Sequence, residues 1–101
     1  MPLGDLQYLT LLAVARLGAR AVAATVRAEL AAVADRDVAV STAFVTLTRL
    51  EDRGLLTSTR GDRPERGGRA VRIFSLTEAG WDELRATRAA SERMWEGVDP
   101  A

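Results

Sequence analysis

The hydrophobic positions in the first third of the chain predict two helices. Between Leu3 and Leu17, apolar residues recur at three- and four-residue steps, and Gly18 follows where a glycine commonly ends a helix. The next segment places four branched residues on one helical face: Val22, Val26, Leu30 and Val33. Alanines fill most of the remaining positions, which favours helix strongly.

The middle of the chain predicts a short strand and a third helix. Residues 38–40 alternate in a way that favours a β-strand, and Ser41 or Thr42 then offers a hydroxyl that would cap a helix running to about Arg53. We expect its inner face to consist of Phe44, Leu47 and Leu50. We expect its outward face to carry Thr42, Val45, Thr46 and Arg49.

The last third predicts a β-hairpin and a long helix. Residues 55–60 and 70–76 favour strands, and the glycine-rich loop between them favours a hairpin. Thr77 can cap a helix that continues to Trp95. Three helices followed by a hairpin describe a winged helix-turn-helix, a mainly α fold. We therefore expect one compact domain, with the winged helix in residues 1–76 and an added helix and tail in residues 77–101.

The amino-acid composition excludes several kinds of catalytic and metal-binding chemistry. The 101 residues include no cysteine and no histidine, which excludes disulfides, thiol nucleophiles, Ser-His-Asp machinery and ordinary zinc sites. No apolar run approaches the ~20 residues of a membrane span. We expect a cytoplasmic protein without cofactor or metal. Adjacent carboxylates such as Glu51 and Asp52 diverge on a helix, so they do not indicate an enzyme.

The 14 basic and 14 acidic residues cancel, but they are segregated. Residues 41–76 hold seven arginines and four acids, a charge of +3, whereas residues 77–101 hold three arginines and six acids, a charge of −3. Every basic residue is an arginine, whose planar fork can grip a phosphate or a guanine through two hydrogen bonds. The basic middle third indicates a nucleic-acid partner.

The hairpin and the third helix carry the candidate DNA contacts. Glycines let the hairpin loop approach another backbone closely, and its arginines suit phosphates or a narrow minor groove. These arginines are Arg60, Arg63, Arg66 and Arg69. On the third helix, the candidates are Ser41, Thr42, Val45, Thr46 and Arg49. Arg27 is a candidate for a phosphate contact, or alternatively for pairing with nearby acids. The loop arginines could likewise pair with Asp62 and Glu65 in solvent.

Several stretches of the sequence resemble the PadR family of bacterial transcription regulators. Residues 38–56, VAVSTAFVTLTRLEDRGLL, are similar to the family's recognition helix, and residues 64–80, PERGGRAVRIFSLTEAG, to its wing and the entry to its last helix. Residues 3–12 fit its first helix. The single C-terminal helix resembles the compact subgroup of the family. The resemblance implies a homodimer that binds double-stranded operator DNA, and we expect a repressor.

Four positions depart from the family pattern. Phe44 stands where the family usually has a tyrosine near the DNA backbone, so the hydroxyl that would donate to a phosphate is lost. Ser41 replaces a common glycine, and Val22 and Ala23 replace a tyrosine-glycine pair. The apolar Phe44 also favours an alternative function, a winged-helix module that docks on another protein.

The last helix predicts a dimer interface. A small helical body can cover only its first turns, so its far end would expose Met94 and Trp95 unless a partner covered them. We expect a homodimer through Leu3, Leu6, Trp81, Leu84, Arg88, Met94 and Trp95. Two reading helices would then lie about 34 Å apart on a pseudo-palindromic site. An alternative role for Trp81 and Trp95 is to stack a small, flat aromatic effector.

Overall fold

The computed structural model describes residues 3–61 and 71–98. Three helices form the body: α1 (Asp5–Leu17), α2 (Ala23–Ala34) and α3 (Val40–Asp52), with a short 3-10 turn at Gly18–Arg20. A hairpin of β1 (Leu56–Arg60) and β2 (Arg72–Leu76) follows, and α4 (Glu78–Trp95) ends the described chain. This is the winged helix-turn-helix that the sequence predicts.

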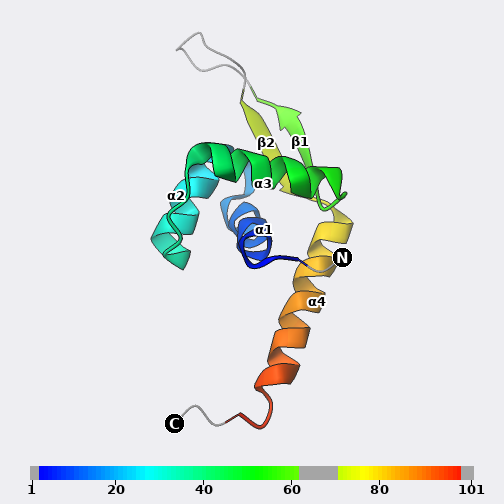
Figure 1. Ribbon diagram of the computed structural model, residues 1–101. Helices are drawn as coiled ribbons and strands as arrows, with labels where there is room; N and C mark the ends of the chain where they lie inside the picture. Colours follow the sequence, from blue (N-terminus) through cyan, green and yellow to red (C-terminus); the bar gives the residue numbers. More distant parts are fainter. Residues whose placement is uncertain (1–2, 62–70, 99–101) are drawn as a thin grey trace.

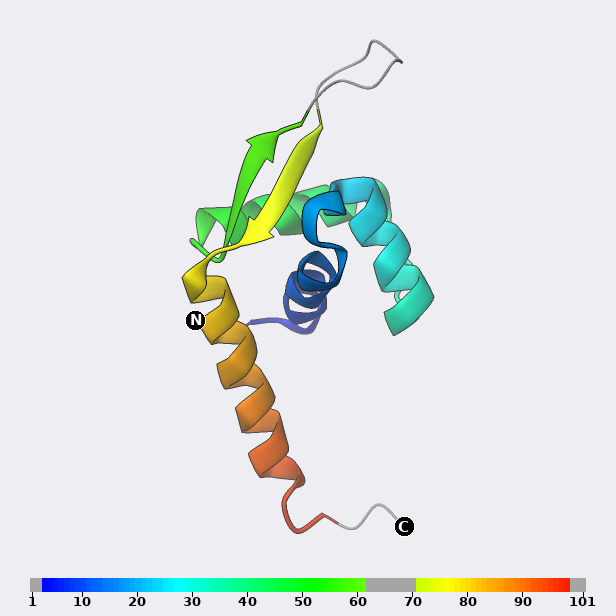
Figure 2. The same cartoon turned by 180° about the vertical axis from the view of Figure 1, so that it is seen from behind.

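The hairpin and α4 extend from opposite ends of the helical body (Figure 1). The view from behind shows the same arrangement, with α1 enclosed by α2, α3 and the start of α4 (Figure 2). The core between these elements is built mainly from leucines of α1, α2 and α3 together with Phe74 of β2, which is fully buried. One contiguous core therefore holds the hairpin against the helices.

The two strands pair antiparallel, with Leu56 opposite Leu76 and Arg60 opposite Arg72. The outer edge of β2 is also engaged, because the Phe74 N–H donates to the carbonyl of Ala21 at 2.9 Å. This bond ties the hairpin to the segment between α1 and α2 and fixes the direction in which the hairpin leaves the body.

The predicted strand at residues 38–40 is wrong. Residues 35–39 are an irregular connection between α2 and α3, and Val40 is already the first residue of α3. The alternation reflects packing of Val38 against the core, while Val40 is exposed. A strand also needs a hydrogen-bonded neighbour, and the described sheet consists of β1 and β2.

The start of α3 also differs from the expectation. Its N-cap is Ala39, so neither Ser41 nor Thr42 caps the helix. The cap of α4 is confirmed: the Thr77 hydroxyl accepts a hydrogen bond from the Gly80 N–H at 3.0 Å and donates to the Gly54 carbonyl at 2.7 Å. Thr77 thereby joins the first turn of α4 to the turn after α3.

Gly80 lets α4 approach the hairpin closely. A Cβ at this position would lie 2.2 Å from the carbonyl oxygen of Leu55, closer than non-bonded atoms can come. Leu84, one turn further on, is buried in the core of its own chain. The first half of α4 is therefore part of the domain, and the second half projects beyond it.

Candidate nucleic-acid interface

The exposed face of α3 points away from the core, on the helix that lies beside the hairpin (Figure 1). The buried stripe of α3 consists of Ala43, Thr46, Leu47 and Leu50, which follow the spacing of one helical face. The opposite side presents small polar and apolar groups together with one arginine. This reading face consists of Ser41, Thr42, Val45, Thr48 and Arg49.

Two residues of α3 lie elsewhere than the sequence predicts. Thr46, expected to face outward, is only 8% exposed, and its hydroxyl donates to the carbonyl of Thr42 at 2.8 Å. Phe44, expected in the core, is 42% exposed. The phase of α3 is rotated relative to the expectation because the small Ala43 and Thr46, not the large Phe44, pack against the other helices.

Arg49 is the basic residue of the reading face. It is exposed, and among the described residues it forms no ion pair. Thr48, which the sequence reasoning missed, is half-buried one position earlier, and its hydroxyl donates to the Val45 carbonyl at 2.9 Å. Placing Ala43 on the inner face of the helix would have placed Thr48 toward the exposed face. The face offers a guanidinium, hydroxyls and a valine to a partner.

The hairpin places Arg60 at the end of β1, exposed and opposite Arg72. The ladder continues one step further, because the Gly61 N–H donates to the Val71 carbonyl at 2.8 Å. Arg63, Arg66 and Arg69 lie outside the described residues.

One carboxylate connects α3 to both strands of the hairpin. Glu51 Oε1 accepts from Arg72 Nη2 at 2.9 Å, and Glu51 Oε2 accepts from the Ser58 hydroxyl at 2.9 Å. Arg72 Nη2 also donates to Ser58 Oγ at 2.7 Å, and its guanidinium lies over the Phe74 ring at 5.9 Å from the centroid. This cluster, which the sequence reasoning missed, holds the wing at a fixed angle to the reading face.

Arg27 lies in the middle of α2, and its side chain reaches the connection between α2 and α3. Its Nε donates to the Val38 carbonyl at 3.2 Å, so it supports the connection that leads into α3. The sequence left phosphate binding and pairing with acids open, and the structure shows a third arrangement, a bond to the backbone.

The far end of α4 is exposed, as the sequence predicts. Met94 is 79% and Trp95 60% exposed, and Val98 beyond them is exposed too. Trp81 is partly exposed, Arg88 pairs with Glu92 on the surface, and Leu3 and Leu6 are half-buried against the core. The expectation for Leu84 is wrong, because its side chain fills the core of its own chain and is not available to a partner.

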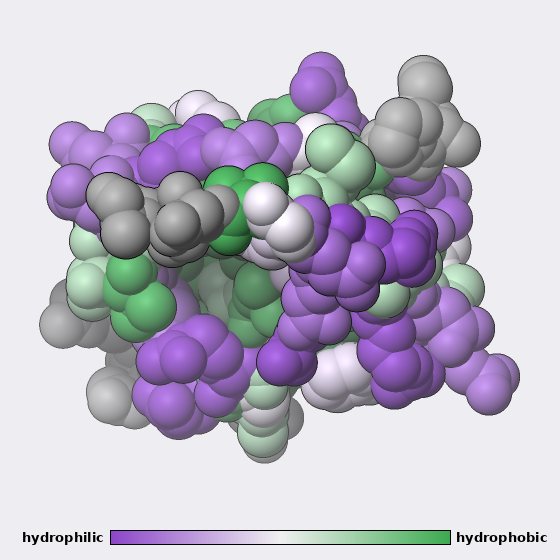
Figure 3. Space-filling model, turned by 90° about the horizontal axis from the view of Figure 1, so that it is seen from below, coloured by the Kyte–Doolittle hydropathy of each residue, from purple (hydrophilic) through white to green (hydrophobic). Residues whose placement is uncertain are grey.

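The face toward which α4 points carries a further apolar region. Figure 3 shows hydrophobic side chains in a hollow at the middle of this face, bordered by hydrophilic ones. A groove between α1 and α2 is lined by leucines, by Val33 and by the ion pair of Arg16 and Glu29.

Among the described residues, no helix is long and apolar enough to cross a bilayer.

The fold and the reading face define a winged helix-turn-helix of the type found in transcription regulators. No protein-family model and no curated protein sequence matches the chain. Solved structures do match. A PadR-like transcription factor from Bacteroides fragilis is 25% identical, with a TM-score of 0.75, over 90% of this chain and 84% of that one.

Two further PadR structures are similar. A PadR family regulator from Eggerthella lenta is 24% identical, with a TM-score of 0.71, over 93% of this chain and 82% of that one. Bacillus subtilis PadR, solved in complex with operator DNA, is 16% identical, with a TM-score of 0.70, over 99% of this chain and 51% of that one. The PadR resemblance of the sequence is thus confirmed, and the chain has the architecture of the PadR-like transcription factors.

Proposed function

We propose that the chain is a DNA-binding transcription regulator that acts as a homodimer in the cytoplasm and represses the promoter to which it binds. The observation that carries the proposal is the pairing of a reading face with a wing. Arg49 stands on α3 without an ion-pair partner in the described chain, and the Glu51–Arg72 pair holds the arginine-bearing hairpin beside it.

We expect α3 and the hairpin to contact different parts of the DNA. On α3, Arg49 can reach guanine or phosphate in the major groove, and Val45 can contact a thymine methyl group. We expect the arginines of the hairpin and its loop to contact the DNA backbone or the adjacent minor groove; they are Arg60, Arg63, Arg66 and Arg69. Ser41 and Thr42 would contribute hydroxyls near the start of α3. Thr46 is buried, so we do not include it among the proposed DNA contacts.

A homodimer follows from the exposed end of α4. Met94 and Trp95 present large apolar groups to water, and removing apolar surface from water is favourable by about 25 cal/mol per Å² before the entropic cost of association is subtracted. The second half of α4 points away from the hairpin, so a second copy can bind there without covering α3 (Figure 2). We expect Trp81 and Arg88 to flank the contact, together with the half-buried Leu3 and Leu6.

Selection of bound duplexes from a random DNA pool tests the proposal. We expect enrichment of a pseudo-palindromic site, and binding measured by fluorescence anisotropy should weaken with salt. About six phosphate contacts per dimer give a slope near −5 for log affinity against log salt. The absence of an enriched sequence, or salt-independent binding, would refute DNA recognition. Transcription in vitro from a promoter that contains the selected site tests repression.

A second candidate function is docking on another protein. The observation in its favour is the apolar surface of Val40, Phe44 and Val45 on α3, all of them exposed. The same selection separates the two candidates, because a docking module enriches no DNA sequence. The surplus of arginines in residues 41–76 favours the DNA-binding function.

A further inference from the structure

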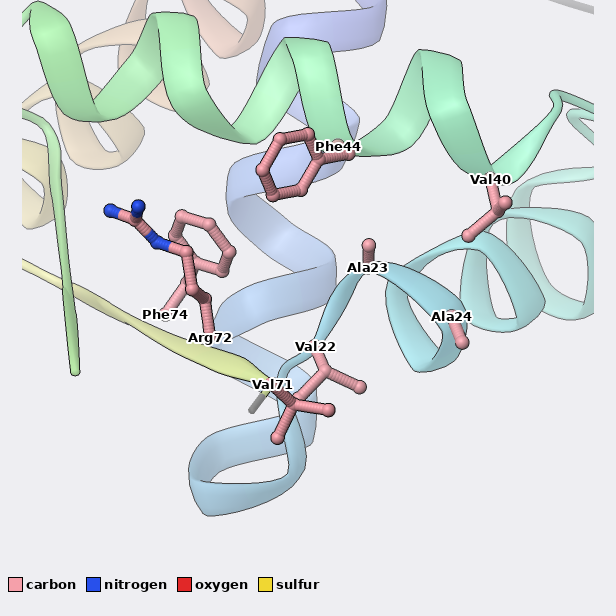
Figure 4. A pocket seen from close by; sticks show the side chains of 8 residues that line it. All are labelled: Val22, Ala23, Ala24, Val40, Phe44, Val71, Arg72 and Phe74. Carbon is pink, nitrogen blue, oxygen red and sulfur yellow. The ribbon is translucent and has the colours of Figure 1, made fainter. Parts of the chain in front are cut away.

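A hollow of about 460 Å³ opens between the first turn of α2, the first half of α3 and the start of β2. Figure 4 shows Phe44 pointing from α3 toward Arg72 and Phe74 of β2, with Val22 and Ala23 on the opposite wall. We call this hollow the wing-base pocket. Its volume falls within the range of about 300–1,000 Å³ that is typical of small-molecule sites.

The walls of the wing-base pocket are almost entirely apolar. They consist of Val22, Ala23, Ala24, Val40, Phe44 and Val71, above the buried ring of Phe74. Val40, Phe44 and Val71 are exposed although they are large and hydrophobic. Three such side chains around one concave surface favour the burial of an apolar group against them.

The positive charge in the pocket wall, on Arg72, is already paired with a carboxylate. Arg72 lines the pocket, but its Nη2 donates to Glu51 at 2.9 Å and to Ser58 at 2.7 Å. An anionic ligand would compete with the Glu51 carboxylate for this guanidinium, and a cationic ligand would find no carboxylate among the lining residues. The pocket therefore suits an uncharged molecule. The Phe44 ring supplies a flat surface on which an aromatic ring can stack.

We propose that the wing-base pocket binds a small, uncharged, flat aromatic compound, and that the bound compound competes with DNA. Competition follows from position. Phe44 adjoins Val45 of the reading face, and Val71 directly precedes β2, so a compound that fills the pocket stands between α3 and the hairpin. Binding itself depends on the pocket alone, whereas competition rests on the proposed function.

Titration with prodan, an uncharged naphthalene dye whose emission shifts in apolar surroundings, tests binding without DNA. We expect saturable binding to the full chain. Ala24→Trp should weaken it about tenfold, because the indole occupies space in the pocket. Phe44→Ala removes the flat wall and should also weaken binding, even if Ala24→Trp fails to fold. Far-ultraviolet circular dichroism reports folding of both variants.

Trp95→Ala is the matched control, because it tests the tryptophan platform that the sequence left open. Prodan affinity should stay within about twofold of the wild type in this variant. The proposal is overturned if prodan does not bind, if affinity survives both pocket variants, or if Trp95→Ala abolishes it. The last result would assign the dye to the end of α4.

Addition of the selected duplex to the prodan complex tests competition. We expect prodan emission to return to its value in water, and prodan at about ten times its Kd should weaken DNA binding about tenfold. Simultaneous binding of dye and duplex would overturn competition. If no duplex binds at all, the proposed function fails, while the titrations without DNA still decide whether the pocket binds the dye.

Discussion

Arg72 on β2 and Glu51 on α3 form an ion pair in which Nη2 and Oε1 lie 2.9 Å apart. Ser58 on β1 donates to the same carboxylate, so one side chain of the reading helix contacts both strands of the wing. A change in the angle between α3 and the hairpin would break these bonds. The pair therefore couples the two surfaces that we propose to contact DNA.

Glu51→Gln should weaken DNA binding more than it weakens the fold. The pair is partly exposed, so its loss should cost about 1 kcal/mol or less in the free energy of unfolding. A wing held less firmly loses more conformational freedom on binding, and the duplex affinity should fall several-fold. Fluorescence anisotropy and urea unfolding measure the two effects.

Glu92→Gln is the matched control for this change. It removes the same charge from the surface pair of Glu92 with Arg88 on α4, far from the wing. Equal DNA affinities of the two variants would show that Glu51 does not position the hairpin.

Arg49→Ala should relax sequence preference. An arginine that contacts a guanine with two hydrogen bonds contributes about 1–3 kcal/mol of discrimination at that base pair. Selected sites should therefore lose one preferred position in each half-site. Arg66→Ala should instead weaken binding to all sequences alike and reduce the salt slope by about 2, because the homodimer loses one phosphate contact in each subunit. A uniform loss for Arg49→Ala would place its guanidinium on a phosphate.

Combined replacement of Met94 and Trp95 by alanine should shift the protein from dimer to monomer. Both side chains are largely exposed in the single chain, so their truncation should leave its core intact. Sedimentation at micromolar concentration measures the shift, and thermal unfolding reports the core. Arg85→Ala on the same helix, which removes only the surface pair with Asp82, should leave the dimer unchanged. A wild-type monomer under these conditions would contradict the dimer.

Thr10→Val should stabilise the domain. The Thr10 hydroxyl is fully buried in α1 and finds no hydrogen-bond partner within the described chain. Removing an unsatisfied hydroxyl at nearly constant shape should raise the free energy of unfolding by about 1 kcal/mol.

Thr46→Val should have the opposite effect on stability from Thr10→Val, because the Thr46 hydroxyl donates to the Thr42 carbonyl at 2.8 Å. Loss of that bond should destabilise the domain. Urea unfolding compares the two variants, and changes of the same sign in both would contradict the argument.

The strongest sequence signals were those with a local cause. The glycines at positions 18 and 54 end helices because both adopt positive φ, and the Thr77 hydroxyl caps α4 through a neighbouring N–H. The basic loop and the exposed end of α4 could be foreseen from residue types alone. The alternation at residues 38–40 was not a reliable signal of a strand, because alternation over three positions also arises in an irregular connection.

The phase of α3 depended on its neighbours. The spacing of apolar residues placed Phe44 on the inner face with Leu47 and Leu50, yet the helix turns Ala43 and Thr46 inward. Close packing of α3 on the other helices admits small side chains there, and the large Phe44 lies at the side, over the wing-base pocket. The same rotation brings Thr48 to the reading face.

The helices, the hairpin and their order could be predicted from the residues alone, because spacing, glycines and capping groups act within a few residues. The residues alone also show which third of the chain is basic. Three features became evident only from the folded chain: the exposed face of α3, the burial of Leu84 in the core, and the contact of Glu51 with Ser58 and Arg72. These outcomes depend on contacts between elements distant in the chain, where side-chain size and the direction of a helix or strand select one arrangement.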